Sequence, residues 1–362
     1  MGQPGMPVVG QPGVAVVATG APVALMAGVA ANVYYAPIVV SQMPGRPPRG
    51  RAVHPEWNPA MDARELRHAM KGLGTDNHDL IRVVCSRDRE HLQYVRLEFR
   101  NQFGRHLLHD IEKETSFFYK DTVTGLVMSD AEYRATVLHT ATKGLGTRDS
   151  TLIDVICTST ATQLAATKAA YQGMFHHDLD HVVKKETTGN FENLLIGLLR
   201  CQRPDWGVVQ ATVQQDVETL WKATEGKIGT DERTVIETIV ARSHDHMAVV
   251  DKAFVNRSKK HHDLRKCLDG ETSGNFKIAL QAAMTHPAHW FAHRIHTAAK
   301  GLGTNDTMLI QCLLLPNQWQ VQDIYNILKT EHHKDLIHLI KSETSGNYQH
   351  ALVAHVENCL RP

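Results

Sequence analysis

The sequence has almost no net charge, because 39 lysines and arginines balance 38 aspartates and glutamates to a formal charge of +1. It therefore lacks the excess of basic residues that draws a protein to nucleic acid or to anionic lipid by charge alone. Binding to an anionic membrane would need another source of positive charge. With 362 residues, the chain is long enough to bury a large apolar core.

Charge is missing altogether from the first 45 residues, which are dominated by Gly, Pro, Val and Ala. The prolines preclude a long helix. The stretch from Val14 to Val40 is apolar, but Pro22, Pro37 and several glycines interrupt it, so we do not expect a membrane span. A signal peptide would need a basic start, and myristoylation would need Ser or Thr in place of Met6. Residues 1–58 are predicted to form a flexible tail.

The six cysteines form no close pairs and no CxxC or Cys/His spacing, which argues against a disulfide framework and against zinc. Cys85 and Cys157 are 72 residues apart and follow similar apolar pairs. Such cysteines fit free, buried core positions in a reducing cytosol. The sequence also offers no Ser/His/Asp order, phosphate loop or catalytic pair of carboxylates, so we do not predict an enzyme.

One short glycine motif occurs four times, and each copy is followed by a distant glutamate. The copies are Lys71-Gly72-Leu73-Gly74-Thr75, Lys143-Gly144-Leu145-Gly146-Thr147, Lys227-Ile228-Gly229-Thr230 and Lys300-Gly301-Leu302-Gly303-Thr304, with Glu114, Glu186, Glu271 and Glu343. The first glycine precedes its glutamate by 42 residues in three copies, and Gly229 does so in the third. A spacing that recurs four times predicts a repeat architecture.

The connection between the second and third copies is longer than the others. Glu114 and Glu186 are 72 residues apart, as are Glu271 and Glu343, whereas 85 residues separate Glu186 from Glu271. Pro204 lies in this connection and discourages a continuous helix. The four repeats are therefore predicted to form two pairs.

Within the repeats, apolar residues recur with the period of a helix and not with that of a strand. In the fourth copy these residues are Leu309, Ile310, Leu313, Leu314, Ile324, Ile327 and Leu328. Helix starts are indicated by Thr75-Asp76, Thr230-Asp231 and Asn305-Asp306, whose side-chain oxygens can accept the free amides of a first turn. The sequence predicts an all-α fold.

The glycines and the distant glutamate match the coordination chemistry of calcium. The ion takes about six to eight oxygens, and backbone carbonyls supply several of them where the chain curls tightly. Glycine permits that curl because it adopts positive φ without steric cost. A carboxylate from elsewhere then balances the charge, and the remaining waters can be exchanged for lipid phosphate oxygens. The alternative is a simple turn between two helices that binds no ion.

These features resemble the annexin family over roughly residues 59–362. The resemblance rests on Gly-Leu-Gly-Thr, on the glutamate spacing, and on the phrases that begin Glu186-Thr187-Thr188-Gly189, Glu271-Thr272-Ser273-Gly274 and Glu343-Thr344-Ser345-Gly346. It implies four repeats of about five helices each, arranged as a curved disc. The implied domains are a tail at 1–58, repeats at 59–128 and 129–200, a linker with the third repeat at 201–286, and a fourth repeat at 287–362.

The resemblance implies that Ca²⁺ is bound by loop carbonyls and one glutamate in each repeat. The implied ligands are Met70, Gly72, Gly74 and Glu114; Thr142, Gly144, Gly146 and Glu186; Thr224, Lys227, Gly229 and Glu271; and Ala299, Gly301, Gly303 and Glu343. The second and fourth sets match the family best. In the second, Arg148 replaces an acidic residue and would either repel calcium or hold a lipid phosphate. In the first, Phe117 and Phe118 stand where other copies have Gly-Asn, and the lost glycine is expected to reorient Glu114.

Each loop also carries an apolar residue at its tip, beside a lysine. The tips are Leu73, Leu145, Ile228 and Leu302, and the lysines are Lys71, Lys143, Lys227 and Lys300. A tip either packs against its own helices or enters the headgroup boundary of a membrane, with the lysines at the phosphate level. Four weak contacts on one rigid face would act together.

The implied function is calcium-dependent binding to anionic phospholipid by a cytoplasmic protein that visits membranes reversibly, in membrane organisation or trafficking. The alternative is a structural scaffold with decayed calcium sites, held at membrane or cytoskeleton by its tail. The tail could also serve self-association or bind a protein partner. Ion conduction through the centre of the disc stays open.

Histidine is abundant, with 23 residues, and occurs in the pairs His176-His177, His261-His262 and His332-His333. Neighbours on a helix point in different directions, so the pairs make poor metal ligands and are expected to be solvated. The bolder hypothesis is that acidification charges them and promotes calcium-independent lipid binding.

Overall fold

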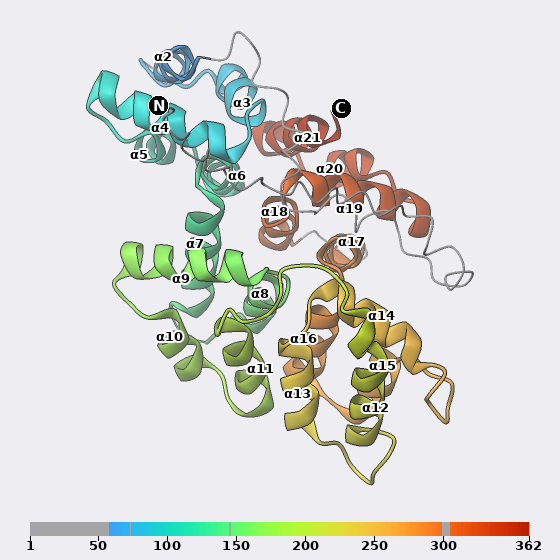
Figure 1. Cartoon of the computed structure of the whole chain (residues 1–362). Coiled ribbons are helices and arrows are strands. Elements are labelled where there is room, and N and C mark those ends of the chain that lie inside the picture. Colours follow the sequence, from blue (N-terminus) through green and yellow to red (C-terminus); the bar gives the residue numbers. More distant parts are fainter. Residues whose placement is uncertain (1–57, 73, 145, 299–304, 362) are drawn as a thin grey trace, which may run out of the picture. The chain divides into compact units, whose positions relative to one another are not determined.

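The structure, a computed structural model, describes residues 58–72, 74–144, 146–298 and 305–361. The predicted tail therefore lies outside the described residues, except for its last residue. The described part is helical and contains no strand (Figure 1), as the apolar period predicts. None of its helices has the length and apolar character needed to cross a bilayer.

The helices form four groups of five, which confirms the predicted repeats. The first group comprises α2 (Pro59–Ala69), α3 (Asn77–Cys85), α4 (Arg89–Phe103), α5 (Leu107–Glu114) and α6 (Phe117–Val127). The second comprises α7 (Asp130–Thr142), α8 (Asp149–Leu152) with its π-helical continuation η2 (Ile153–Cys157), α9 (Ala161–Phe175), α10 (Leu179–Glu186) and α11 (Gly189–Leu199).

The third and fourth groups repeat this order. The third comprises the 3₁₀ turn η3 (Gln210–Thr212) with α12 (Val213–Ala223), then α13 (Glu232–Val240), α14 (His244–Phe254), α15 (Leu264–Glu271) and α16 (Gly274–Met284). The fourth comprises α17 (Pro287–Ala298), α18 (Asp306–Leu314), α19 (Gln318–Glu331), α20 (Leu336–Glu343) and α21 (Gly346–Leu360). In every group the short fourth helix ends on the repeated glutamate.

The packing within each group follows one scheme. The first helix packs on the third, in the pairs α2 and α4, α7 and α9, α12 and α14, and α17 and α19. The second helix packs on the fifth, in the pairs α3 and α6, η2 and α11, α13 and α16, and α18 and α21. All seven apolar positions predicted for the fourth repeat are buried. Each repeat thus buries an apolar core of its own, and the periodicity identifies its members.

The groups also contact one another through their second and fifth helices. Groups one and four meet through α3, α6, α18 and α21, whereas groups two and three meet through η2, α11, α13 and α16 (Figure 1). Between groups two and four, the buried Asp154 accepts hydrogen bonds from Trp290 Nε1 at 2.8 Å and from the Arg294 guanidinium at 2.7 Å. These contacts hold the repeats in fixed register.

Three of the predicted helix starts are confirmed by their caps. Asp76, Asp231 and Asn305 each accept a hydrogen bond from the backbone amide three residues later, at 3.0, 3.1 and 3.0 Å. In the second repeat Arg148 occupies the cap position of α8 and makes no such bond. The side-chain oxygen is thus present in the copies with Asp or Asn, and missing where arginine replaces it.

The histidine pairs have a backbone explanation. His176, His261 and His333 adopt the left-handed conformation, with φ of 58°, 54° and 53°, and are exposed. Gly104 holds the corresponding place in the first repeat, with φ of 65°, at the end of α4. Histidine tolerates this conformation better than most residues other than glycine. One member of each pair therefore holds a left-handed turn on the solvated surface, at the end of α9 for His176 and after the ends of α14 and α19 for His261 and His333.

All six cysteines are free thiols. Five are buried, including Cys85 and Cys157 as predicted, whereas Cys201 is half-buried. It follows α11 in the connection between repeats two and three, where the chain leaves the helical packing. Burial raises the pKa of the Cys85 thiol to about 12 and also raises that of Cys201.

The burial pattern predicts that the native protein exposes one thiol to reagents. With a neutral disulfide reagent at pH 8, Cys201 should react first, and the other five should react only on unfolding, because a thiol must be both accessible and ionised. A Cys201→Ser variant is the control and should lose the fast phase. Two or more fast-reacting thiols in the native protein would contradict the described packing.

Candidate functional site

The repeated glycine motif forms the loop between the first and second helices of each described repeat. Its glycines adopt positive φ, with values of 117° and 87° at Gly72 and Gly74, 109° and 84° at Gly144 and Gly146, and 75° at Gly229. A side chain at these positions would meet no neighbouring atom, so backbone conformation and not space demands glycine there. The loops are thus curled in the way that the calcium chemistry requires.

A backbone hydrogen bond closes the base of each described loop. The amide of Asp76 donates to the carbonyl of Ala69 at 2.8 Å, and the backbone amide of Arg148 donates to the carbonyl of Ala141 at 3.0 Å. In the third repeat Asp231 donates to Ala223 at 2.7 Å. The loop therefore leaves the first helix and returns to the same point.

The distant glutamate reaches its loop in the three repeats whose loops are described. The hydroxyl of Thr75 donates to Glu114 Oε2 at 2.7 Å, that of Thr147 to Glu186 Oε2 at 2.5 Å, and that of Thr230 to Glu271 Oε2 at 3.1 Å. These glutamates end α5, α10 and α15. The fold thus brings together the two parts of the motif that the constant spacing links.

Each of these carboxylates keeps ligand capacity after the threonine bond. Among the described residues, no hydrogen-bond donor faces Oε1 of Glu114 or Glu186. A carboxylate oxygen also has two lone pairs, so Oε2 can hold the threonine and still face a cation. Curled carbonyls next to an oriented carboxylate form the oxygen-rich donor set that Ca²⁺ prefers.

The threonine is a functional residue that the sequence analysis missed. The sequence places Thr75 and Thr230 at the start of the next helix, whereas in the structure Asp76 and Asp231 cap that helix and the two threonine hydroxyls donate to Glu114 and Glu271. The available signal was its position directly after the last glycine in all four copies. Residues that orient a metal ligand without touching the metal are a regular part of metal sites.

Comparison with known proteins gives the same family as the motif. The family model described as Annexin matches residues 61–126, 133–198, 215–283 and 290–355. The chain belongs to the annexin family. It is 32% identical to annexin A5 of Cynops pyrrhogaster over 303 residues, which are 83% of this chain and 93% of that relative. It is also 32% identical to annexin A7 of Dictyostelium discoideum over 297 residues, or 81% of this chain and 63% of that relative.

Solved annexin structures share the fold. Annexin III superposes with a TM-score of 0.79 at 28% identity, covering 85% of this chain and 95% of that one. Chicken annexin V gives a TM-score of 0.73 at 30% identity, covering 83% of this chain and 96% of that one. Annexins are known for calcium-dependent phospholipid binding and are in general not enzymes.

This annexin departs from its own pattern in the first repeat, where Phe117 replaces the glycine that begins the fifth helix elsewhere. Phe117 has φ of 51°, close to the 66°, 60° and 62° of Gly189, Gly274 and Gly346. The backbone path is therefore retained, and Glu114 still binds Thr75. The prediction that loss of glycine reorients Glu114 is wrong, because phenylalanine accepts the left-handed conformation at a cost of about 1–3 kcal/mol.

The third repeat has the longer loop that its sequence indicates. The amide of Gly226 donates to Trp221 at 2.7 Å, and Lys227 donates to Thr224 at 3.3 Å, which adds an inner turn. Gly226 is required there, since a Cβ would lie 2.9 Å from Lys222 Cα. Ile228 at the tip has a relative exposure of 102%, so the alternative that the tip packs against its own helices is wrong for this loop.

The fourth loop lies outside the described residues, which leaves Ala299, Lys300, Gly301, Leu302 and Gly303 as predictions, and the same holds for the tips Leu73 and Leu145. The fourth glutamate, Glu343, is described. It ends α20 and is half-buried, as Glu114 and Glu186 are in their helices. The lysines Lys71, Lys143 and Lys227 are exposed.

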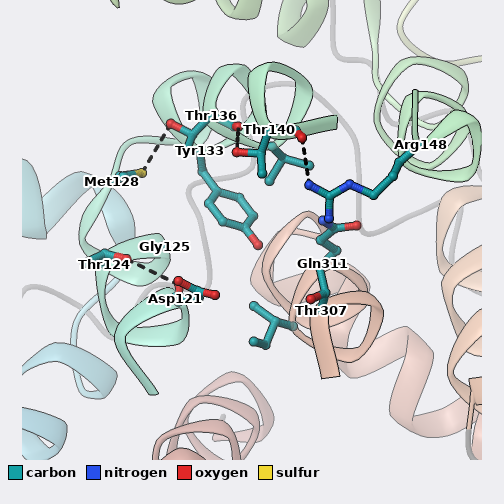
Figure 2. A pocket seen from close by; sticks show the side chains of 12 residues that line it. Asp121, Thr124, Gly125, Met128, Tyr133, Thr136, Thr140, Arg148, Thr307 and Gln311 are labelled. Carbon is teal, nitrogen blue, oxygen red and sulfur yellow. Dashed lines mark hydrogen bonds between the residues drawn. The ribbon is translucent and has the colours of Figure 1, made fainter. Parts of the chain in front are cut away.

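Arg148 follows the second loop but lies over a cavity of about 150 Å³ lined by α6, α7 and α18 (Figure 2). Its guanidinium donates to the Thr140 carbonyl at 2.7 Å. Asp121 and Gln311 also line this cavity, and burial raises the pKa of Asp121. The bond directs the Arg148 side chain to α7, and its predicted roles at the loop, repelling calcium or holding a lipid phosphate, stay predictions.

The threonine bonds yield a first test of the site. Replacing Thr75, Thr147 and Thr230 together by valine should raise the calcium concentration for half-maximal vesicle binding by about tenfold, because the glutamates lose the donor that orients them. The matched control places serine at the same three positions and keeps the hydroxyl. Equal calcium requirements in the valine and serine proteins would show that the bond does not orient the ligand.

Proposed function

We propose that this annexin binds anionic phospholipid membranes when calcium occupies the loops of its repeats. The observation that carries the proposal is the hydrogen bond from the loop threonine to the distant glutamate, found in all three described loops. Family membership supports it independently, since annexins are known for this activity. The bound ion supplies positive charge, so a nearly neutral protein has a positive surface only when calcium is present.

The proposed ligands are the loop carbonyls together with the glutamates of the four repeats. Positive φ at the glycines and the closed loop bases support this assignment in repeats one to three. In the third repeat the Thr224 carbonyl also accepts the amide of Lys227, so its second lone pair would face the ion. The complete set is the one named from the sequence, with Glu343 and its loop as the fourth member.

Lipid would complete the coordination of the bound ion. Ca²⁺ retains water where the protein offers no ligand, and phosphate oxygens can replace that water. The exposed Lys71, Lys143 and Lys227 would add attraction to the phosphate level. Ile228, fully exposed at its tip, would enter the headgroup boundary, where an apolar side chain is better placed than in water.

Two contacts between repeats support a shared binding face. Asn275 follows Glu271 by four residues and donates to Asp149, the first residue of α8, at 2.5 Å. Phe118 follows Glu114 by four residues and lies 5.7 Å from the ring of Tyr348, which follows Glu343 by five. We infer that sites two and three open on one side of their contact, and that sites one and four do likewise. Sites on one face bind with avidity.

Repeat boundaries of 59–128, 129–200, 201–286 and 287–362 are supported by helix groups that fit within them. A cytoplasmic location and a role in membrane organisation or trafficking fit a reversible membrane protein with free thiols. Contacts of the tail with itself, a partner or the cytoskeleton concern residues that the structure does not describe.

Calcium removal tests the proposed function directly. The full chain should sediment with phosphatidylserine vesicles at millimolar calcium and should return to the supernatant when a chelator is added, because the ion bridges protein and phosphate. Neutral phosphatidylcholine vesicles are the control for charge. Vesicle binding that persists in chelator would favour the scaffold alternative.

Substitution of the glutamates tests the ligand assignment. Glu186→Gln combined with Glu343→Gln should raise the calcium needed for half-maximal binding by about tenfold or more and leave the helical signal intact, because only the charge at two sites is lost. The matched control, Glu90→Gln with Glu357→Gln, removes two exposed carboxylates that lie away from the loops. An unchanged calcium dependence in the first protein would reject the assignment.

A further inference from the structure

Phe117 is the most exposed aromatic side chain among the described residues, with a relative exposure of 84%. It is the first residue of α6 and has φ of 51°. The equivalent residues of the other repeats are Gly189, Gly274 and Gly346, which begin α11, α16 and α21. The first repeat alone thus places a large apolar side chain at this point.

Two unfavourable features coincide at this residue. An L-residue with a bulky side chain is strained in the left-handed region, where glycine is not. The ring also stands in water, so the strain is not offset by apolar burial within the repeat. The next aromatic residues behave differently, since Phe118 contacts Tyr348 and Tyr119 is buried. Packing of the fold therefore explains Tyr119 and Phe118 but leaves Phe117 unexplained.

The surroundings of Phe117 point to the proposed membrane face. It follows Glu114 by three residues, and Glu114 is held to the first loop by Thr75. Its neighbour Phe118 contacts Tyr348, whose hydroxyl donates at 3.5 Å to the carbonyl of Asp306, the first residue after the fourth loop and its cap. The exposed ring is therefore carried by a segment that touches the surroundings of two calcium loops.

We propose that Phe117 is a membrane anchor, which inserts its ring into the boundary between headgroups and acyl chains once calcium holds the first repeat at an anionic bilayer. This inference rests on the proposed function and adds a second, apolar contact to it. The occupant is lipid, because a single protruding ring beside the phosphate-binding loops matches the depth of the interfacial region.

Because the backbone at Phe117 is strained, the ring can be removed without loss of stability, and its effect on membrane binding can be measured separately. A Phe117→Gly variant restores the residue that the other repeats use and relieves the left-handed strain, so its midpoint of thermal unfolding should be unchanged or higher. At saturating calcium its half-maximal binding to phosphatidylserine vesicles should require about tenfold more lipid, since the buried ring is lost. Calcium binding without lipid should stay as in the wild type, because Thr75 and Glu114 are untouched.

Leu97→Ala is the matched control, because Leu97 is also exposed, at 55%, but lies in the middle of α4. It should bind vesicles as the wild type does. Equal vesicle binding by Phe117→Gly and the wild type would overturn the anchor while leaving the proposed function intact. A wild type that fails to bind vesicles with calcium would overturn both.

A variant that adds a phenylalanine to another repeat tests the anchor in the opposite direction. Gly189→Phe places the same side chain at the equivalent point of the second repeat, where a Cβ would meet no atom within 4 Å and φ is 66°. The midpoint of thermal unfolding should fall because of backbone strain. The lipid concentration for half-maximal vesicle binding should also fall, because a second ring can insert. Sedimentation of these proteins without lipid measures their self-association. If Phe117→Gly changes self-association and not lipid binding, the ring is a protein contact and the inference is wrong.

Discussion

The hydrogen bond between a loop threonine and a glutamate 39 to 41 residues later is the constraint on which the proposed calcium sites depend. It joins the loop after the first helix to the end of the fourth, so a repeat must be folded before its site exists. The glycines alone would leave the loop neutral, and the glutamate alone would point into water. Site formation is thus coupled to the packing of each five-helix group.

In the proposed function, repetition turns a weak local site into a membrane-binding surface. Each group buries its own apolar core and meets a neighbour through its second and fifth helices, beside the residues that carry the sites. A protein with a formal charge of +1 has little attraction to anionic lipid until ions occupy several loops together. The proposed anchor at Phe117 would add apolar burial to this charge-driven contact and would act only after calcium has brought the surface close.

The fold could be predicted from sequence because its signals are local and repeated: the helical period around Leu309 and Leu313, the caps at Asp76 and Asp231, and the constant spacing of the glutamates. What could not be predicted depends on side-chain direction and backbone conformation. The Thr75 hydroxyl is free to cap a helix or to bind Glu114, and only the folded loop decides. From the sequence, Phe117 is expected to reorient Glu114, because phenylalanine disfavours the left-handed conformation that it nonetheless adopts.

The central claim is that the threonine-linked glutamates are calcium ligands. It is tested most directly by a crystal structure of the full chain with saturating calcium, in which anomalous scattering locates the ions. The account predicts ions beside Glu114, Glu186 and Glu271, with carboxylate oxygens at about 2.3–2.6 Å and the threonine hydrogen bonds retained. Ions absent from these loops at saturating calcium, or bound only at exposed carboxylates elsewhere, would contradict it.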